Sequence, residues 1–174
     1  MGKIIFFEEK NFGGCYYDCS SDCTDLQSHF RRCNSIKVES GCFMIYEGAN
    51  YTGHQYFVSP GQYPEFQKWM ATNDCICSCR VIPQLNDSFK LSIYERLEFG
   101  GQMMDLTDSC PNVLDSFRTN DIFSCKVKEG NWLFYDQPNY KGRIYLLMPR
   151  EYSRFSEWGG VTARVGSIKR IVEY

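Results

Sequence analysis

The fold is decided by the eight residues Phe7-Glu-Glu-Lys-Asn-Phe12-Gly-Gly14, because their pattern returns three more times along the chain. The pattern is an aromatic residue, an acidic residue, three further residues, a second aromatic residue, any residue, and glycine. The later copies are Tyr46-Glu-Gly-Ala-Asn-Tyr51-Thr-Gly53, Tyr94-Glu-Arg-Leu-Glu-Phe99-Gly-Gly101 and Tyr135-Asp-Gln-Pro-Asn-Tyr140-Lys-Gly142. An internal repeat of this kind predicts several copies of one supersecondary unit.

Each copy has the composition of a long, folded β-hairpin. A short β-rich run precedes it, such as Ile4-Ile5-Phe6, and another follows it, such as Gln55-Tyr56-Phe57-Val58. Two strands joined by about six residues that end in glycine form a hairpin with a long loop. The glycine supplies the positive φ that a folded-over turn needs. The four predicted hairpin glycines are Gly14, Gly53, Gly101 and Gly142.

A second element follows each hairpin and begins with serine. Its copies are Ser35-Ile-Lys-Val, Ser78-Cys-Arg-Val, Ser124-Cys-Lys-Val and Ser167-Ile-Lys-Arg. The alternating hydrophobic positions predict a strand. We expect each serine hydroxyl to bond to backbone groups of the bent hairpin.

A larger period shows that the copied unit is a pair of motifs. Tyr63 and Trp69 recur as Tyr152 and Trp158, and Ser35 recurs as Ser124, each 89 positions later. Two motifs packed face to face form a β-sandwich of ordinary domain size, whereas one hairpin alone is marginal. The sequence therefore predicts an all-β protein of two β-sandwich domains, each made of two Greek-key motifs. The predicted boundaries are 1–83, a polar linker at 84–88, and 89–174.

Charge and composition limit the partners that can be expected. The net charge is −2 and no basic run exceeds a pair, so a nucleic-acid partner is not expected. The apolar stretch near the N-terminus is only four residues long, so we expect no signal peptide, no membrane association and a cytoplasmic location. The ten cysteines are then expected to be mostly reduced. Asn86-Asp87-Ser88 matches a glycosylation pattern but is interpreted as linker.

The four hairpins and four serines in register resemble the βγ-crystallins, the structural proteins of the vertebrate eye lens, over essentially the whole chain. Within that family the sequence looks like a γ-crystallin, most like the S-type. The resemblance implies a monomer in the cytoplasm of lens fibre cells, with weak self-association and contacts with other crystallins. It implies a structural role that gives transparency and a high refractive index at high protein concentration. The alternative is a calcium-binding or stress-related relative outside the lens.

The resemblance also implies an apolar interface between the domains. It maps onto Met44, Phe57 and Ile82 in the first domain and onto Leu133, Leu146 and Ile171 in the second. Two positions depart from the family pattern. Phe43 stands where the family usually has tryptophan, and Ile144 stands where a polar partner of Gln55 is usual.

Catalytic and metal sites are not expected, and neither is a cofactor. His29 and His54 are the only histidines, and no nucleophile elbow or phosphate loop accompanies them. The calcium pattern of microbial relatives is approached only by Asn73, Asp74 and Ser78, and it fails at Cys77, so at best weak binding is expected. The run Cys75-x-Cys77-x-Cys79 is interpreted as a strand whose alternate residues point apart, which disfavours zinc. Oxidation is expected at Cys19 and Cys23.

Overall fold

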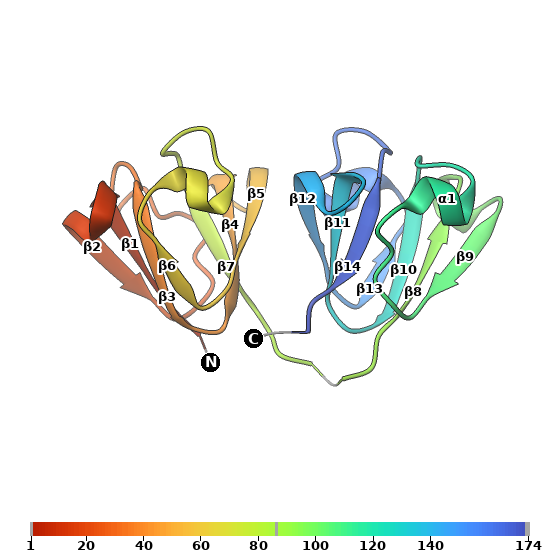
Figure 1. Cartoon of the computed structure of the whole chain (residues 1–174), viewed down its shortest axis with the longest axis horizontal. Coiled ribbons are helices and arrows are strands. Elements are labelled where there is room, and N and C mark those ends of the chain that lie inside the picture. The colour runs from red at the N-terminus through yellow and green to blue at the C-terminus, as the bar shows by residue number, and fades with distance from the viewer. Residues whose placement is uncertain (1, 86, 173–174) are drawn as a thin grey trace. The chain divides into compact units, whose positions relative to one another are not determined.

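The computed structural model describes residues 2–85 and 87–172, and their regular secondary structure is mostly β-strand (Figure 1). Contacts divide these residues into two compact units, 2–84 and 85–172, which we call the N-terminal and C-terminal domains. The predicted linker and the glycosylation-type triplet both include Asn86, which lies outside the described residues. So do Met1, Glu173 and Tyr174 at the ends of the predicted domains. The exact linker boundaries therefore stay a prediction.

The N-terminal domain contains seven strands and two short 3-10 helices among its described residues. They are β1 (Lys3–Glu9), η1 (Lys10–Phe12), β2 (Gly13–Cys19), β3 (Ser35–Ser40), β4 (Cys42–Gly48), β5 (Thr52–Val58), β6 (Gly61–Tyr63), η2 (Phe66–Trp69) and β7 (Ser78–Ile82). One sheet has the antiparallel order β2-β1-β3-β6. In the other sheet β4 pairs with β5 on one side and with β7 on the other.

The C-terminal domain repeats this arrangement. Its described elements are β8 (Lys90–Tyr94), η3 (Leu97–Phe99), β9 (Met103–Leu106), α1 (Val113–Phe117), β10 (Ser124–Glu129), β11 (Trp132–Gln137), β12 (Lys141–Leu147), β13 (Arg150–Tyr152), η4 (Phe155–Trp158) and β14 (Ser167–Arg170). One sheet has the order β13-β10-β8-β9, and in the other β11 pairs with β12 and β14.

An exchange of short segments joins the two motifs of each domain. Strand β6 follows β5 in sequence but pairs with β3 of the first motif. In return Cys23, from the first motif, makes an antiparallel bridge to Cys79 on β7. The C-terminal domain repeats both links, through β13 on β10 and through the bridge from Cys110 to Ile168. Neither motif is therefore complete without the other.

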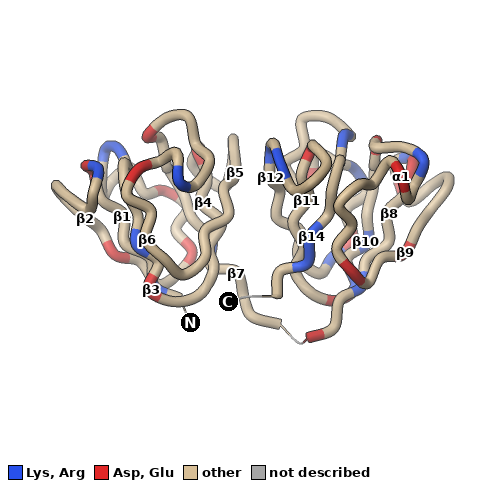
Figure 2. Tube along the Cα trace, in the orientation of Figure 1, with Lys and Arg blue, Asp and Glu red and all other residues tan. Residues whose placement is uncertain are grey.

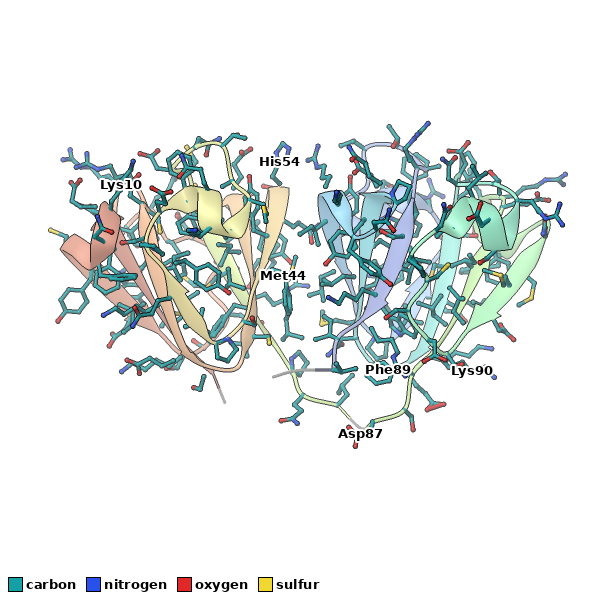
Figure 3. The ribbon with its side chains drawn as sticks, in the orientation of Figure 1. Lys10, Met44, His54, Asp87, Phe89 and Lys90 are labelled. Atoms are coloured by element: carbon teal, nitrogen blue, oxygen red, sulfur yellow. The ribbon has the colours of Figure 1, made fainter. Side chains whose placement is uncertain are left out.

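The interior of each sandwich is filled from alternate positions of its strands. In β4 the side chains of Phe43 and Ile45 belong to the N-terminal core, and in β11 those of Trp132 and Phe134 belong to the C-terminal core. Strand alternation places the residues between them on the outer face of the sheet. Figure 3 draws the side chains as sticks and labels Met44, the residue between Phe43 and Ile45 in the sequence.

The predicted all-β fold of paired Greek-key sandwiches is confirmed, with two local differences. One is a local helix outside the predicted strands: the first turn of the five-residue α1 is capped by Asn112 Oδ1, which accepts from Asp115 N at 3.3 Å. The prediction of a strand through Cys75 is wrong, because β7 begins at Ser78. Cys75 and Cys77 therefore precede the strand, and the alternation argument does not apply to them.

Within residues 2–85 and 87–172, no helix has the length and apolar character needed to cross a membrane.

Candidate functional site

The feature that the molecule repeats most faithfully is a folded hairpin held by a buried serine. The first hairpin joins β1 to β2 through η1, and the other three occupy the equivalent places in their motifs. We call each of the four a serine-anchored hairpin, and each is described by its aromatic pair, its glycine and its serine. Together they are the candidate functional site, because they set the shape of both domains.

The serine hydroxyl makes the same two hydrogen bonds in every copy. In the first hairpin Ser35 Oγ donates to Glu9 O at 2.6 Å and accepts from Phe12 N at 2.9 Å. Ser78, Ser124 and Ser167 donate to the carbonyls of Gly48, Arg96 and Gln137 at 2.6–2.7 Å. They accept from the N–H groups of Tyr51, Phe99 and Tyr140 at 2.9–3.0 Å. All four serines are fully buried, and each buried hydroxyl is satisfied by bonding to one carbonyl and one N–H of its hairpin.

The hairpins fold over because their backbone is left-handed at several successive positions. Asn11 and Phe12 have φ of 55° and 64°, and Gly14 has φ of 75°. The other copies repeat these values within a few degrees, with Asn50, Glu98 and Asn139 at the first position and with Gly53, Gly101 and Gly142 at the last. A non-glycine residue in this region is strained, and two in succession persist only when the surroundings hold them. The hydrogen bond from the N–H of the second of these residues to the serine hydroxyl holds the backbone in this conformation.

Each hairpin carries a tilted or edge-to-face aromatic pair on its folded side. The ring centroids of Phe7 and Phe12 are 5.7 Å apart, and those of Tyr135 and Tyr140 are also 5.7 Å apart. The two remaining pairs, Tyr46 with Tyr51 and Tyr94 with Phe99, lie at 5.4 and 5.6 Å. This range suits edge-to-face packing, which adds to the burial of the rings. Burial also raises the pKa of Tyr135 to about 12.

A basic side chain two residues after each serine completes the hairpin, and the sequence analysis did not single it out. Lys37 and Lys126 place their Nζ atoms 4.6 Å from the ring centroids of Phe12 and Phe99. Arg80 lies 4.2 Å from the Tyr51 ring, and Lys169 lies 5.4 Å from the Tyr140 ring. A cation within this distance of an aromatic face is attracted to it. The signal was present in the sequence as Ser-x-Lys or Ser-x-Arg in all four copies.

In three of the four hairpins the acidic residue of the pattern contacts the residue that follows the glycine. Glu95 Oε1 accepts from Gln102 N, and Asp136 Oδ1 accepts from Arg143 N, both at 2.8 Å. In the second hairpin Glu47 Oε1 lies 3.6 Å from His54 Nδ1. The carboxylate thus fixes the residue immediately after the left-handed glycine.

A tyrosine corner closes the second motif of each domain. Tyr63 Oη accepts from Ser59 N at 3.0 Å and donates to Ser59 O at 2.9 Å. Tyr152 Oη accepts from Met148 N at 3.0 Å. The nearby rings of Trp69 and Trp158 lie 6.5 and 5.9 Å from these tyrosines. The repeated Tyr-x5-Trp pattern seen in the sequence therefore marks the corner of each sandwich.

All ten cysteines are free thiols, and they differ strongly in exposure. Cys15 and Cys75 are exposed and Cys23 is half-buried, whereas Cys19 is buried and its Sγ lies 4.0 Å from Cys79 Sγ. Burial raises the pKa of the thiols of Cys33 and Cys125. Of the two thiols predicted to be redox-sensitive, Cys19 therefore lies inside the domain.

The residues of the degenerate calcium pattern are engaged with the protein. Ser78 anchors the second hairpin, as described above. Asn73 Oδ1 accepts from Cys75 N at 2.9 Å, and Asp74 Oδ2 accepts from Asn34 Nδ2 at 3.4 Å. Within residues 2–85 and 87–172 there is no cluster of three or more His, Cys, Asp or Glu side chains arranged to hold a metal ion.

The six residues predicted to form the domain interface share one property. None belongs to the interior core of its own domain. In the N-terminal domain Met44 pairs with Phe57 across β4 and β5, and in the C-terminal domain Leu133 pairs with Leu146 across β11 and β12. Each of the two sheets therefore presents an apolar pair on its outer face.

The rings of the two histidines each lie beside a tyrosine ring. The His29 ring stacks on Tyr17 with centroids 3.8 Å apart, and the ring of His54 lies beside that of Tyr56, at 6.4 Å. A surface hollow of about 380 Å³ is lined by Glu95, Arg96, Leu97 and Phe123. The Glu95 carboxylate in this lining already accepts a hydrogen bond from Gln102 N within the third hairpin.

Two similar domains, four serine-anchored hairpins and two tyrosine corners define a protein of paired Greek-key sandwiches. The chain belongs to the beta/gamma crystallin family, whose model, described as "Beta/Gamma crystallin", matches residues 3–82 and 90–171.

Several relatives match almost the full length of the chain. Gamma-crystallin S-1 of Chiloscyllium indicum is 55% identical over 99% of this chain and 100% of its own. Gamma-crystallin-4 of Xenopus laevis is 56% identical over 97% of this chain and 98% of its own. Gamma-crystallin B of Bos taurus is 52% identical over 100% of this chain and 99% of its own. The predicted similarity to γ-crystallins, the S-type among them, and the prediction of a crystallin rather than an enzyme are confirmed by these relatives.

Proposed function

We propose that this protein is a structural constituent of the eye lens, which gives transparency and a high refractive index at high protein concentration. The observation that carries the proposal is the content of the two cores. They are packed with aromatic and sulfur side chains, among them Phe6, Phe43 and Cys79 in one domain and Phe134, Trp158 and Cys125 in the other. Such side chains are polarizable, and the whole chain has 28 aromatic residues, 16 sulfur-containing residues and 10 arginines.

The surface supports the same role. Residues of both signs are interspersed along the backbone trace of each domain (Figure 2). A net charge of −2 limits long-range repulsion, and mixed charges limit association. The proposal includes a cytoplasmic monomer with only weak self-association and weak contacts with other crystallins.

The optical part of the proposal is tested by the refractive index increment of the purified full-length protein. We expect an increment above that of a globular protein of average composition, and clear solutions as the concentration rises. An average increment, or turbidity at modest concentration, would contradict the optical role. Antibody staining of tissue sections tests the site of action, with strong signal expected in lens fibre cells and absence from the lens as the contrary result.

We also propose that the outer apolar pairs form the interface between the two domains. Support comes from each domain by itself, because Phe57 and Leu146 occupy equivalent positions outside their own cores. A double-mutant cycle of Phe57→Ala and Leu146→Ala measures the coupling. Phe57→Ala is expected to lower the free energy of unfolding of the N-terminal domain by about 1–3 kcal/mol through lost burial. Additive effects of the two changes would count against the interface, and Val161→Ala, at an exposed residue, is the control.

A further inference from the structure

Three cysteines meet at one edge of the N-terminal domain, where the chain passes from one sheet to the other. Cys19 is the last residue of β2, and Cys23 already bridges to Cys79 on β7 of the second sheet, with N–O distances of 2.9 and 3.0 Å. The Sγ atoms of Cys19 and Cys79 lie 4.0 Å apart, although the residues are 60 positions apart in sequence. Cys23 Sγ donates instead to Asp25 O at 3.3 Å. Cys19 Sγ therefore has a thiol partner, Cys79, on the second sheet.

The surroundings of this pair differ for its two members. Cys79 is fully buried, whereas Cys19 keeps 7% of its surface exposed. The hydrogen bond between the two sulfur atoms lowers the pKa of Cys19 and raises that of Cys79. His29 lies close enough to lower the pKa of Cys19 further. Cys19 is thus the more reachable and more readily ionised thiol, and Cys79 holds the proton.

We propose that Cys19 and Cys79 form a peroxide-reactive dithiol site that joins the two sheets of the N-terminal domain when it is oxidised. The substrate is a small hydroperoxide. This inference does not depend on the proposed role in the lens.

The chemistry needs only the two thiols and the peroxide. The Cys19 thiolate attacks one peroxide oxygen, the O–O bond breaks, and the leaving oxygen takes a proton to give water or an alcohol. Cys19 is then a sulfenic acid. Cys79 sulfur attacks the Cys19 sulfur, its proton passes to the departing hydroxide, and a disulfide and a second molecule of water result. One peroxide is reduced by two electrons while two thiols are oxidised.

The C-terminal domain supplies an internal comparison for this site. Cys19 pairs with Ile4 in the first sheet, and Leu106 pairs with Leu91 at the equivalent place. The bridge of Cys23 to Cys79 is matched by that of Cys110 to Ile168. The same fold therefore accommodates leucine and isoleucine at the positions of Cys19 and Cys79, and only the N-terminal domain carries the dithiol pair.

This comparison provides the variants for the test. Fully reduced full-length protein is treated with one equivalent of hydrogen peroxide, the remaining thiols are alkylated, and unreduced peptides are mapped by mass spectrometry. Wild type is compared with Cys79→Ile and Cys19→Leu, which copy the C-terminal domain, and with Cys15→Ser as an exposed-thiol control. Near-ultraviolet circular dichroism reports whether each variant keeps its packing.

We expect a Cys19–Cys79 peptide as the first oxidation product of wild type and of Cys15→Ser. In Cys79→Ile that peptide is lost, sulfenic acid at Cys19 is trapped by dimedone, and peroxide reacts about tenfold more slowly because the hydrogen bond to the thiolate is gone. Oxidised wild type is expected to unfold at higher urea concentration than reduced protein, since a cross-link restricts the unfolded chain. A first disulfide between Cys19 and Cys23, or through Cys15, would overturn the proposal. Because that result is read from wild type, it stands even if a variant fails to fold.

Discussion

The two domains have the same backbone scaffold but fill it with different side chains. Ser35 and Ser124 make the same pair of hydrogen bonds in the two domains. Inside, the N-terminal domain buries Phe43 where the C-terminal domain buries Trp132. The C-terminal domain likewise has hydrocarbon side chains at the positions of the N-terminal thiol pair. The difference teaches that the backbone bonding of the hairpins sets this fold, while the interior accepts varied side chains of suitable volume.

The largest effect is expected where the domains are alike, at the serines. Ser35→Ala and Ser124→Ala should each lower the free energy of unfolding by about 2–5 kcal/mol, because a carbonyl and an N–H both lose their buried partner. Urea denaturation of the full-length protein measures the loss, with Ser156→Ala at an exposed serine as the control. A loss confined to one of the two anchored serines would break the proposed equivalence of the domains.

A smaller effect is expected at the position where the two cores contain different aromatic residues. Trp132→Phe gives the C-terminal domain the residue of the N-terminal one and removes the hydrogen bond from Trp132 Nε1 to Glu129 O, which is 3.0 Å long. We expect a loss of about 1–2 kcal/mol from that bond and from the reduced volume. Thermal unfolding followed by circular dichroism checks it. An unchanged midpoint would mean that the two interiors are freely interchangeable at this position.

The cations over the hairpin rings should contribute less. Lys37→Met and Lys126→Met keep most of the aliphatic chain and remove the charge, so each should cost about 0.5–1 kcal/mol. Chemical denaturation in low and high salt is the measurement, with exposed Lys68→Met as the matched control. Equal losses at Lys68 and at the two hairpin lysines would show that the effect is one of net charge alone.

The smallest predicted difference is a response to pH that only the C-terminal domain shows. Glu157 has a lowered pKa, chiefly because Ser153 donates to it and also because Arg150 and Arg154 lie nearby, whereas the N-terminal domain has Lys68 at the equivalent position. A carboxyl with a lowered folded-state pKa stabilises the fold above its unfolded pKa of about 4.3, and this contribution is lost as the pH falls through the folded value. Unfolding midpoints measured across this range should fall less in Glu157→Gln than in wild type. An identical pH profile for Glu157→Gln and wild type would refute the stabilising role assigned to Glu157.

Much of this structure could be predicted because it depends on short sequence patterns that repeat along the chain. Glycine at a fixed distance from two aromatic residues predicts a folded turn, and a serine at the head of each returning strand predicts its anchor. The exchange of β6 between motifs could not be predicted, because strand pairing across a sandwich leaves no local pattern. The contact between Cys19 and Cys79 was missed for the same reason, since it joins residues 60 positions apart. The basic residues over the rings could have been found from the repeated Ser-x-Lys or Ser-x-Arg pattern. That pattern was interpreted only as the alternation of a strand.

The central claim is that four buried serines hold four left-handed hairpins, and amide hydrogen exchange tests it most directly. The amides of Phe12, Tyr51, Phe99 and Tyr140 donate to serine hydroxyls and should exchange slowly in wild type. Each Ser→Ala change should release the amide of its own hairpin more than the strand amides around it. Rapid exchange of these four amides in the unaltered protein would contradict the account.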